Sequence, residues 1–331
     1  MKSIVFAAML AAVSGPLSAQ YMPAGVCSSH ALAHKLSSLV NPLADSSVVP
    51  VAFFDGAAGE YPESLTVDRA GNSYLGMVFG RRIVKVTPAG VRSDYAAIDD
   101  NFLLGLKFDE RGNLFVCGAS GVWKVPPQGA PALFAPIPGH GFLNDLVIDR
   151  HGNLYVTDSF NYKLWKVDPQ GNAQLWSSDP LLEGRAGIFP NLLGPNGIVL
   201  DGDGRRLWVA ITSAGRVIEY RIQRNGTAGP ARVLADDPRL VGADGMTQDA
   251  CGNLYLAVNI QDRIARVTPS GRVSDVAFEG LLSCPTAVAW GAGRTAGSLL
   301  VCNNGNVFFS DSPVGEGLLR ITPNHGRGSR H

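Results

Sequence analysis

Short apolar and polar runs alternate along most of the chain, and one combination of them recurs as a repeat. Each copy has two apolar residues, an aspartate, a Gly-Asn turn and a β-rich run, as in VIDRHGNLYV. The other copies are TVDRAGNSYL, KFDERGNLFV, VLDGDGRRLWV, TQDACGNLYL and a degenerate VAWGAGRTAGSLLV. The turn aspartates Asp68, Asp109, Asp149, Asp201 and Asp249 are 41, 40, 52 and 48 residues apart, and Trp290 follows after 41 more. Runs bounded by Gly, Pro, Asn and Asp predict β-strands, and a period of about 40–50 residues predicts propeller blades.

The number of strands predicts six blades and a closed ring. Third strands occur six times, from RIVKVTP to GLLRITP, but only five of them are followed by a fourth strand. The run VVPVAFF at residues 48–54 is an additional strand, and we expect it to complete the sixth blade. This closure removes an exposed sheet edge. The sequence therefore favours an all-β, six-bladed propeller over residues 48–323 rather than a solenoid or a twisted sandwich.

The two ends of the chain have a different character. Residues 1–19 combine a lysine, an apolar run and a small-residue cleavage site, which predicts a signal peptide and a secreted or periplasmic protein. The apolar run is too short to span a bilayer. Residues 20–47 are expected to be a leader segment that could form a short helix, and residues 324–331 a flexible tail.

Composition narrows the classes of partner. The 28 basic and 28 acidic residues cancel and no basic cluster occurs, so neither nucleic-acid binding nor stable membrane association is expected. We expect a monomer that binds a small molecule. Five cysteines occur without a metal-binding spacing. Cys284 and Cys302 are the pair favoured for a disulfide, because the repeat places them on neighbouring strands of one blade.

One polar column runs through the repeats at the start of each innermost strand. Five residues before each turn aspartate, and before Trp290, stand Glu63, Leu104, Asn144, Asn196, Asp244 and Pro285. Equivalent positions of a propeller are related by rotation, so four oxygen-bearing side chains should meet at one mouth of the channel, while blades two and six stay apolar there. Two carboxylates and two amides suit Ca²⁺ best, with Mg²⁺, Mn²⁺ or Zn²⁺ as other possibilities.

A purely structural role of this column is the alternative interpretation. Asn and Asp side chains at strand starts often cap turns, and propeller channels can hold water without a metal. The turn aspartates are assigned to this structural class, because they recur in nearly every blade.

The blades resemble the regucalcin (senescence marker protein) and gluconolactonase family of six-bladed propellers. The motifs that carry this resemblance are PESLTVD, LNDLVIDRHGNLYVTD, GPNGIVLDGDGRRLWVA and ADGMTQDACGNLYLAV, over about residues 50–323. The resemblance implies a divalent-metal-dependent lactonase or esterase with Glu63, Asn196 and Asp244 as metal ligands. It also implies that Asn144 lies beside the metal and contacts the substrate.

The chain departs from the family at two positions near these motifs. The family's substrate-binding arginine, two residues before the asparagine, is Phe142 here, and Pro62 replaces a small residue before Glu63. A substrate more apolar than a sugar lactone is therefore expected. In the mechanism that we expect, a metal-activated water attacks the carbonyl, Asp244 accepts its proton and Asn144 stabilises the oxyanion.

Three more residues are candidates from their place in loops. His140, four residues before Asn144, is a candidate second acid or base. Arg185 and Phe189 belong to the insertion that lengthens one spacing to 52 residues, and we expect them to contact substrate. The alternatives are a non-catalytic binding propeller of NHL-like repeats and a strictosidine-synthase-like or lyase propeller. No GxSxG motif or dinucleotide fingerprint supports a serine hydrolase or an NAD enzyme.

Overall fold

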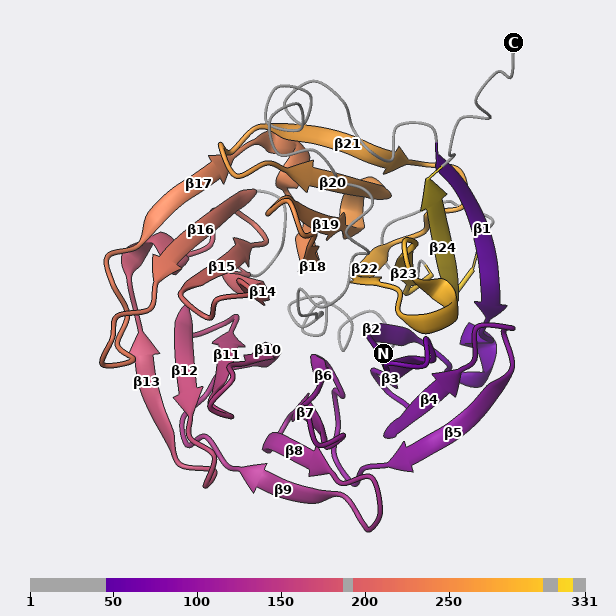
Figure 1. The fold of residues 1–331 in the computed structure, drawn as a ribbon, viewed down its shortest axis with the longest axis horizontal. Helices are drawn as coiled ribbons and strands as arrows, with labels where there is room; N and C mark the ends of the chain where they lie inside the picture. The colour runs from indigo at the N-terminus through magenta and orange to yellow at the C-terminus, as the bar shows by residue number, and fades with distance from the viewer. Residues whose placement is uncertain (1–45, 187–192, 306–314, 324–331) are drawn as a thin grey trace.

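Six four-stranded antiparallel sheets are arranged as the blades of a ring (Figure 1), which confirms the predicted fold class. The computed structural model describes residues 46–186, 193–305 and 315–323. The expected signal peptide, most of the leader and the tail lie outside these residues. The strands of blade one are β2 (Pro62–Val67), β3 (Ser73–Met77), β4 (Arg82–Val86) and β5 (Arg92–Ala97). Blade two has β6 (Leu106–Phe108), β7 (Leu114–Gly118), β8 (Gly121–Val125) and β9 (Ala132–Ala135).

The other four blades repeat this order outward from the channel. Blade three has β10 (Leu143–Ile148), β11 (Leu154–Asp158), β12 (Lys163–Val167) and β13 (Ala173–Ser177). Blade four has β14 (Pro195–Leu200), β15 (Arg206–Ile211), β16 (Arg216–Arg221) and β17 (Arg232–Asp236). Blade five has β18 (Ala243–Gln248), β19 (Leu254–Val258), β20 (Arg263–Val267) and β21 (Val273–Phe278). Blade six has β22 (Pro285–Trp290), β23 (Leu299–Asn303), β24 (Gly317–Pro323) and, from the other end of the chain, β1 (Ser46–Phe53).

The N-terminal strand closes the ring as the strand count predicts. β1 is the outermost strand of blade six and pairs antiparallel with β24, from Ser46 opposite Pro323 to Phe53 opposite Gly317. The strand begins two residues earlier than expected from the apolar run. Because the first described segment and the last share one sheet, the ring cannot open without breaking this pairing.

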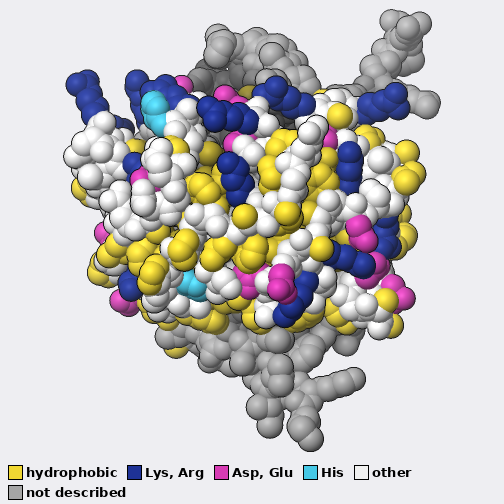
Figure 2. Space-filling model, turned by 90° about the horizontal axis from the view of Figure 1, so that it is seen from below, with side chains coloured by type: hydrophobic (Ala, Val, Ile, Leu, Met, Phe, Trp, Pro, Cys, Tyr) yellow, Lys and Arg dark blue, Asp and Glu magenta, His cyan; other side chains and the backbone are white. Residues whose placement is uncertain are grey.

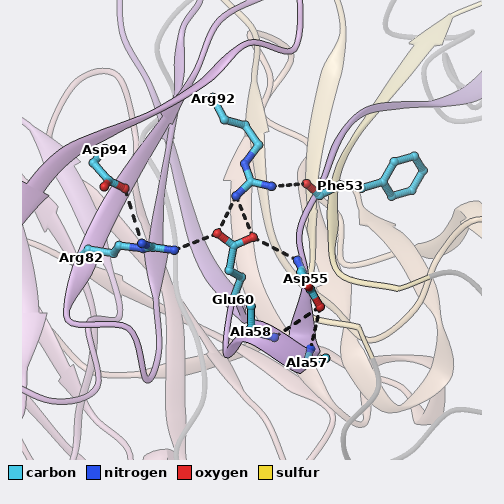
Figure 3. Close-up of polar contacts among 8 residues, drawn as sticks. All are labelled: Phe53, Asp55, Ala57, Ala58, Glu60, Arg82, Arg92 and Asp94. Atoms are coloured by element: carbon cyan, nitrogen blue, oxygen red, sulfur yellow. Dashed lines mark hydrogen bonds and ion pairs between the residues drawn. The ribbon is translucent and has the colours of Figure 1, made fainter.

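Glu60 connects the closing strand to blade one (Figure 3). Its carboxylate accepts hydrogen bonds from the guanidinium groups of Arg92 (2.6 Å) and Arg82 (2.8 Å) and from the backbone N–H of Asp55 (3.0 Å). Arg92 also donates to the carbonyl of Phe53, the last residue of β1. Burial acts to raise the pKa of Glu60, but the Asp55 N–H and the two guanidinium groups outweigh it and hold the pKa below its usual value.

The Glu60→Gln variant is expected to lose about 1–2 kcal/mol of unfolding free energy at neutral pH, because hydrogen bonds to charged groups are lost. A lowered carboxyl pKa contributes stability that is present at neutral pH and disappears as the pH falls through that pKa. The difference from wild type should therefore shrink at acid pH. Denaturant unfolding at pH 7 and near pH 3 measures it, with the exposed Glu110→Gln as control. Equal stability of both variants at pH 7 would contradict this role.

The turn aspartates have the structural role expected for them. In blade three, Asp149 accepts hydrogen bonds from the backbone N–H groups of His151 (2.8 Å) and Asn153 (2.9 Å) and from the Asn153 amide (2.8 Å). Gly152 completes the turn at φ 81°, a conformation that costs glycine little. The same pattern at Asp68, Asp109 and Asp249 explains why this motif recurs.

The core consists of apolar layers between neighbouring blades. Val199 and Trp208 of blade four pack in one cluster with Met246 and Leu256 of blade five. At the outside of the molecule, basic and acidic side chains are scattered among apolar ones on the face shown in Figure 2. Among the described residues, no helix is long and apolar enough to cross a membrane.

The favoured disulfide between Cys284 and Cys302 is wrong, because both thiols are free and buried. The backbone of Cys284 pairs with Asn304, which lies two residues beyond Cys302 along the neighbouring strand. That offset is about 7 Å, longer than the usual Cα separation across a disulfide. Cys117 is also free, whereas Cys251 is disulfide-bonded.

Candidate functional site at the channel mouth

The polar column lies at the inner ends of the blades. Glu63 is in β2, Asn144 in β10, Asn196 in β14 and Asp244 in β18, the innermost strands of their blades (Figure 1), and each of these side chains is 0% exposed. The innermost strands of adjacent blades pack against one another around the ring. Leu104, just before β6, takes the equivalent place in blade two and is also buried.

A β-bulge occurs at this position in five blades. In blade one, the pairing of the innermost strand with the second strand skips Glu63. In blades three, four and five it skips two consecutive residues, of which the first is Asn144, Asn196 or Asp244. Bulges of this kind redirect side chains and are frequent beside active sites. Side chains of a regular strand alternate between the two faces of the sheet, and the bulge interrupts this alternation at the column residues.

Blade six presents Thr286 at this position, not the expected Pro285. Its ladder shifts between Pro285 and Ala287, so Thr286 is the bulged residue. The N–H of Asn304 bonds to the carbonyl two residues before Thr286, as the corresponding residues do in blades three to five. Blade six has no turn aspartate, so counting back from Trp290 places the column residue one position too early in the sequence. The column therefore has oxygen-bearing side chains in five blades and an apolar one in blade two.

A second column supports the first and was missed by sequence reasoning. It consists of the residues that follow the second strand of blades three to six, Ser159, Thr212, Asn259 and Asn304. The amides of Asn144 and Asn196 donate to the hydroxyls of Ser159 (2.8 Å) and Thr212 (2.9 Å). The carboxylates instead receive amide donors, from Asn259 to Asp244 Oδ2 and from Asn304 to Glu63 Oε2, both at 3.0 Å.

The chemistry of the second column matches that of the first. Hydroxyls that accept hydrogen bonds face the amides, and amides that donate face the carboxylates, so each pair fixes the orientation of the inner side chain. The repeat contains a signal for these residues, since Ser159 and Asn259 stand ten residues after the turn aspartates of their blades. Blades one and two have Val78 and Ala119 in this place.

The two carboxyl groups are buried, and neither forms an ion pair with a described residue. Burial raises the pKa of Glu63 well above its usual value, and the charge of Asp244 raises it further. Burial likewise raises the pKa of Asp244, more than the neighbouring amides of Asn259 and Asn196 lower it. Glu63 Oε1 and Asp244 Oδ1 are both buried and make no hydrogen bond within the described part of the chain. Buried oxygens of this kind usually have a partner.

These observations fit a divalent cation between the carboxylates. A cation would satisfy both unpartnered oxygens and offset the repulsion between the two charges, and oxygen donors are the ligands that Ca²⁺ and Mg²⁺ prefer. The described residues contain no cluster of three or more His, Cys, Asp or Glu side chains suited to a metal. Any further protein ligands would therefore be amide or hydroxyl oxygens of the column.

The thiols beside the site are poor candidates for ligands. Burial and the charge of Glu63 raise the pKa of the Cys302 thiol well above its usual value, and the same two causes act on Cys284. Only a thiolate binds metals strongly. The environment of the mouth therefore favours oxygen ligands over sulfur.

Comparison with known proteins agrees with this architecture. Residues 94–304 match the model of the SMP-30/Gluconolactonase/LRE-like region. The chain belongs to this family. Among curated relatives, "Lactonase drp35" of Staphylococcus epidermidis is 27% identical over 215 residues, which cover 61% of this chain and 64% of the relative. The chain thus spans just under two thirds of the length of that relative.

Two further similarities were found. "Protein STRICTOSIDINE SYNTHASE-LIKE 3" of Arabidopsis thaliana is 29% identical over 175 residues, which are 49% of this chain and 44% of the relative. Among solved structures, a calcium-binding protein, regucalcin, from Agrobacterium tumefaciens superposes with a TM-score of 0.63 at 18% identity, over 82% of this chain and 94% of its own. At that identity the structural similarity shows the fold alone.

The loop before Asn144 carries two of the predicted residues and is held by Asp158. The Asp158 carboxylate accepts hydrogen bonds from the backbone N–H groups of Gly141 (3.1 Å) and Phe142 (2.8 Å). Phe142 is partly buried and packs between two other aromatic rings. His140 is partly buried, and its Nδ1 makes no hydrogen bond to any described residue.

Of the other two loop candidates, only Arg185 lies among the described residues. The side chain of Arg185 is 56% exposed and forms an ion pair with Asp236 of the outer strand β17 (3.1 Å). Its backbone N–H donates to the hydroxyl of Ser213, the residue after Thr212, and its predicted contact with substrate stays a prediction. Phe189 lies outside the described residues, so its predicted role remains a prediction.

Asp145 links blades three and four directly beneath the mouth. This buried residue follows Asn144, and its carboxylate accepts hydrogen bonds from the backbone N–H groups of Leu146 (2.6 Å) and Ile198 (2.8 Å). Lys107 of blade two is a buried residue of opposite charge that interacts with Asp145 electrostatically, although its Nζ makes no hydrogen bond to a described residue. Burial lowers the pKa of Lys107 and raises that of Asp145, and in each case the charge of the other opposes the shift. Asp145 thereby holds Asn144 beside the blade that carries Asn196.

Proposed function

We propose that this protein hydrolyses a lactone or carboxylic ester at the channel mouth, with one divalent cation bound there. The observation that carries the proposal is the pair of buried carboxylates, Glu63 and Asp244. Each has one oxygen without a hydrogen bond to a described residue, and a bound cation would offset the burial and repulsion that raise the pKa of Glu63. Membership of a family that includes lactonases supports the reaction class. Glu63, Asn196 and Asp244 would hold the cation, with Asn144 beside it.

The residues of the mouth have distinct roles in this proposal. A bound divalent cation would polarise the substrate carbonyl and lower the pKa of a water molecule. Asp244 accepts the proton of the attacking water as the new carbon–oxygen bond forms. Asn144, whose amide is oriented by its hydrogen bond to Ser159, would donate a hydrogen bond to the developing oxyanion. The bond from the acyl carbon to the leaving oxygen then breaks, and His140 is the proposed donor of the proton that this oxygen requires.

Calcium is the ion that we propose first. All candidate ligands carry oxygen, and one structural relative is described as a calcium-binding protein. Mg²⁺, Mn²⁺ and Zn²⁺ are the alternatives for the test below. We also propose that the protein is exported and acts as a monomer on a small molecule. A bonded cysteine, Cys251, supports export, since disulfides persist in oxidising compartments.

A second candidate is a non-hydrolytic propeller. The relative named strictosidine-synthase-like favours it, because the same fold would then serve a different reaction. Dependence on metal and on the two carboxylates separates the candidates, since only the hydrolase proposal requires both for activity.

Metal removal is expected to abolish hydrolysis of lactones and esters. Protein treated with a chelator should retain under about 1% of its activity toward a panel of γ-lactones, δ-lactones and aryl esters, because both water activation and carbonyl polarisation are lost. Acid release measured by pH-stat follows the reaction, and Ca²⁺, Mg²⁺, Mn²⁺ and Zn²⁺ are added back separately. Hydrolysis that is unchanged after complete metal removal would overturn the proposal.

A further inference from the structure

Five aromatic side chains form a continuous arc above blades one to three. Tyr61 packs edge-on against Phe79 (5.8 Å between ring centroids), Phe79 against Phe102 (6.4 Å) and Phe102 against Phe142 (5.8 Å). Phe142 then contacts Phe160 at 5.4 Å. Each ring of the arc therefore packs against the next one.

The register of the repeat places this arc at the same mouth as the polar column. Tyr61, Phe102 and Phe142 each stand two residues before the column residue of their blade. The equivalent residues of blades four to six are Gly194, Gly242 and Cys284. At this register position, aromatic rings thus stand in blades one to three and small residues in the other three.

The apolar members of the two inner columns lie on the same side of the mouth as the arc, next to the polar Glu63 and Asn144. Leu104 is the apolar member of the first column, and Val78 and Ala119 are the apolar members of the second. All three belong to blades one and two, beneath the arc. A ligand that spans the mouth would thus meet oxygen-bearing side chains at one end and apolar ones at the other.

The arc is not part of the closed core. Phe79 is 37% exposed, and the other four rings are only partly buried. In contrast, the aromatic residues between blades, such as Tyr155 and Tyr255, are fully buried. Connected apolar surface that remains accessible beside a polar site is typical of ligand-binding surfaces.

The backbone at the centre of the arc is strained. Phe102 has φ 54°, in the left-handed region that a bulky side chain rarely adopts. Backbone bonds on both sides hold it there, from Ala119 N–H to the Asn101 carbonyl (3.0 Å) and from Leu104 N–H to the Cys117 carbonyl (2.9 Å). Such strain persists where the surrounding structure fixes it, and it is concentrated at functional sites.

We propose that the aromatic arc is the subsite for a flat apolar group of the substrate, an aryl ring or a comparably planar hydrocarbon next to the ester or lactone carbonyl. This inference rests on the proposed function of the same mouth. Aromatic rings stack edge-on and offset on a planar group, and burial of that group contributes in proportion to its area. A polyhydroxylated lactone would leave its hydroxyls without partners above the arc, which lowers its affinity.

Binding of lactams tests the subsite separately from catalysis, because lactams resemble lactones but resist hydrolysis. Calorimetry on the calcium-loaded full chain would compare δ-valerolactam with its phenyl-substituted analogue. We expect the phenyl analogue to bind at least about 10-fold more tightly to the wild type. The Phe79→Ala and Phe142→Ala variants should lose most of this difference while their affinity for the unsubstituted lactam stays within about twofold.

Two controls make the result decisive. Phe79 is already partly exposed, so its replacement leaves the fold intact even where Phe142→Ala reduces stability. Phe278→Ala removes an exposed ring of β21, on the outer edge of blade five, and should leave the preference unchanged. Equal affinity of the wild type for both lactams, or a preference that survives both arc variants, would overturn the subsite.

Hydrolysis of matched lactones distinguishes the two proposals. If lactones are hydrolysed without preference for the phenyl-substituted one, the subsite is wrong and the proposed function stands. If the phenyl lactam binds on the arc but no lactone or ester is hydrolysed with any of the metals, the proposed function is wrong and the subsite stands.

Discussion

The Asp244→Asn variant is expected to lose about 10³-fold in kcat/KM for the best lactone or ester substrate. Loss of a positioned general base costs about 10²- to 10⁴-fold, and the same change removes one of the two charges that would hold the cation. A factor of 10³ corresponds to about 4 kcal/mol of transition-state stabilisation. Initial rates over a range of substrate and Ca²⁺ concentrations measure both effects. Glu63→Gln should weaken metal binding in the same way but leave a proton acceptor in place.

A buried carboxylate outside the mouth provides the matched control. Glu219 is 3% exposed and forms an ion pair with Arg232 at 2.8 Å in blade four. Glu219→Gln should alter stability but keep metal affinity and kcat/KM within about threefold of wild type, because this side chain lies away from the mouth. If Asp244→Asn and Glu63→Gln behaved like this control in both measurements, the assignment of the site would be wrong.

The Asp145→Asn variant is expected to destabilise the fold by about 3 kcal/mol or more. Asp145 and Lys107 are buried opposite charges that interact electrostatically, and removal of one such charge leaves the other uncompensated, which typically costs about 3–5 kcal/mol. An asparagine would also lose one of the two oxygens that accept the N–H groups of Leu146 and Ile198. Denaturant unfolding at neutral pH gives the difference in unfolding free energy.

A double variant tests the reason for this loss. If the uncompensated charge of Lys107 is the cause, the Lys107→Met/Asp145→Asn protein should recover a large part of the lost stability. Both buried groups would then be uncharged. If the losses of unfolding free energy in the Lys107→Met and Asp145→Asn variants simply add in the double variant, Asp145 acts through its backbone hydrogen bonds alone.

The fold could be predicted because each blade repeats one short pattern. The aspartate turns, the six third strands and the unpaired run before Phe54 were enough to predict six blades and their closure by the N-terminal strand. The rotational equivalence of the blades predicted one column of polar residues, Glu63, Asn144, Asn196 and Asp244. All four are buried on innermost strands in the structure. These inferences depend on local turn chemistry and on topology, both of which a repeat preserves.

The features that could not be predicted are strand register in blade six and contacts made by loops. The bulge shifts blade six by one residue, so Thr286 rather than Pro285 occupies the column. The offset between Cys284 and Cys302 follows from the same shift. The ion pair of Arg185 with Asp236 joins an insertion to an outer strand, and no repeat fixes the direction of that insertion. The supporting residue Asn304 acts on Glu63 across the ring closure, a contact between positions 241 residues apart.

The most direct test of the account is the position of a bound metal. Anomalous diffraction from crystals soaked in Mn²⁺, compared with crystals soaked in Ca²⁺, would locate it. The account predicts one ion within about 2.0–2.6 Å of both Glu63 Oε1 and Asp244 Oδ1. A mouth without an ion at saturating metal, or an ion bound elsewhere while hydrolysis proceeds, would contradict it.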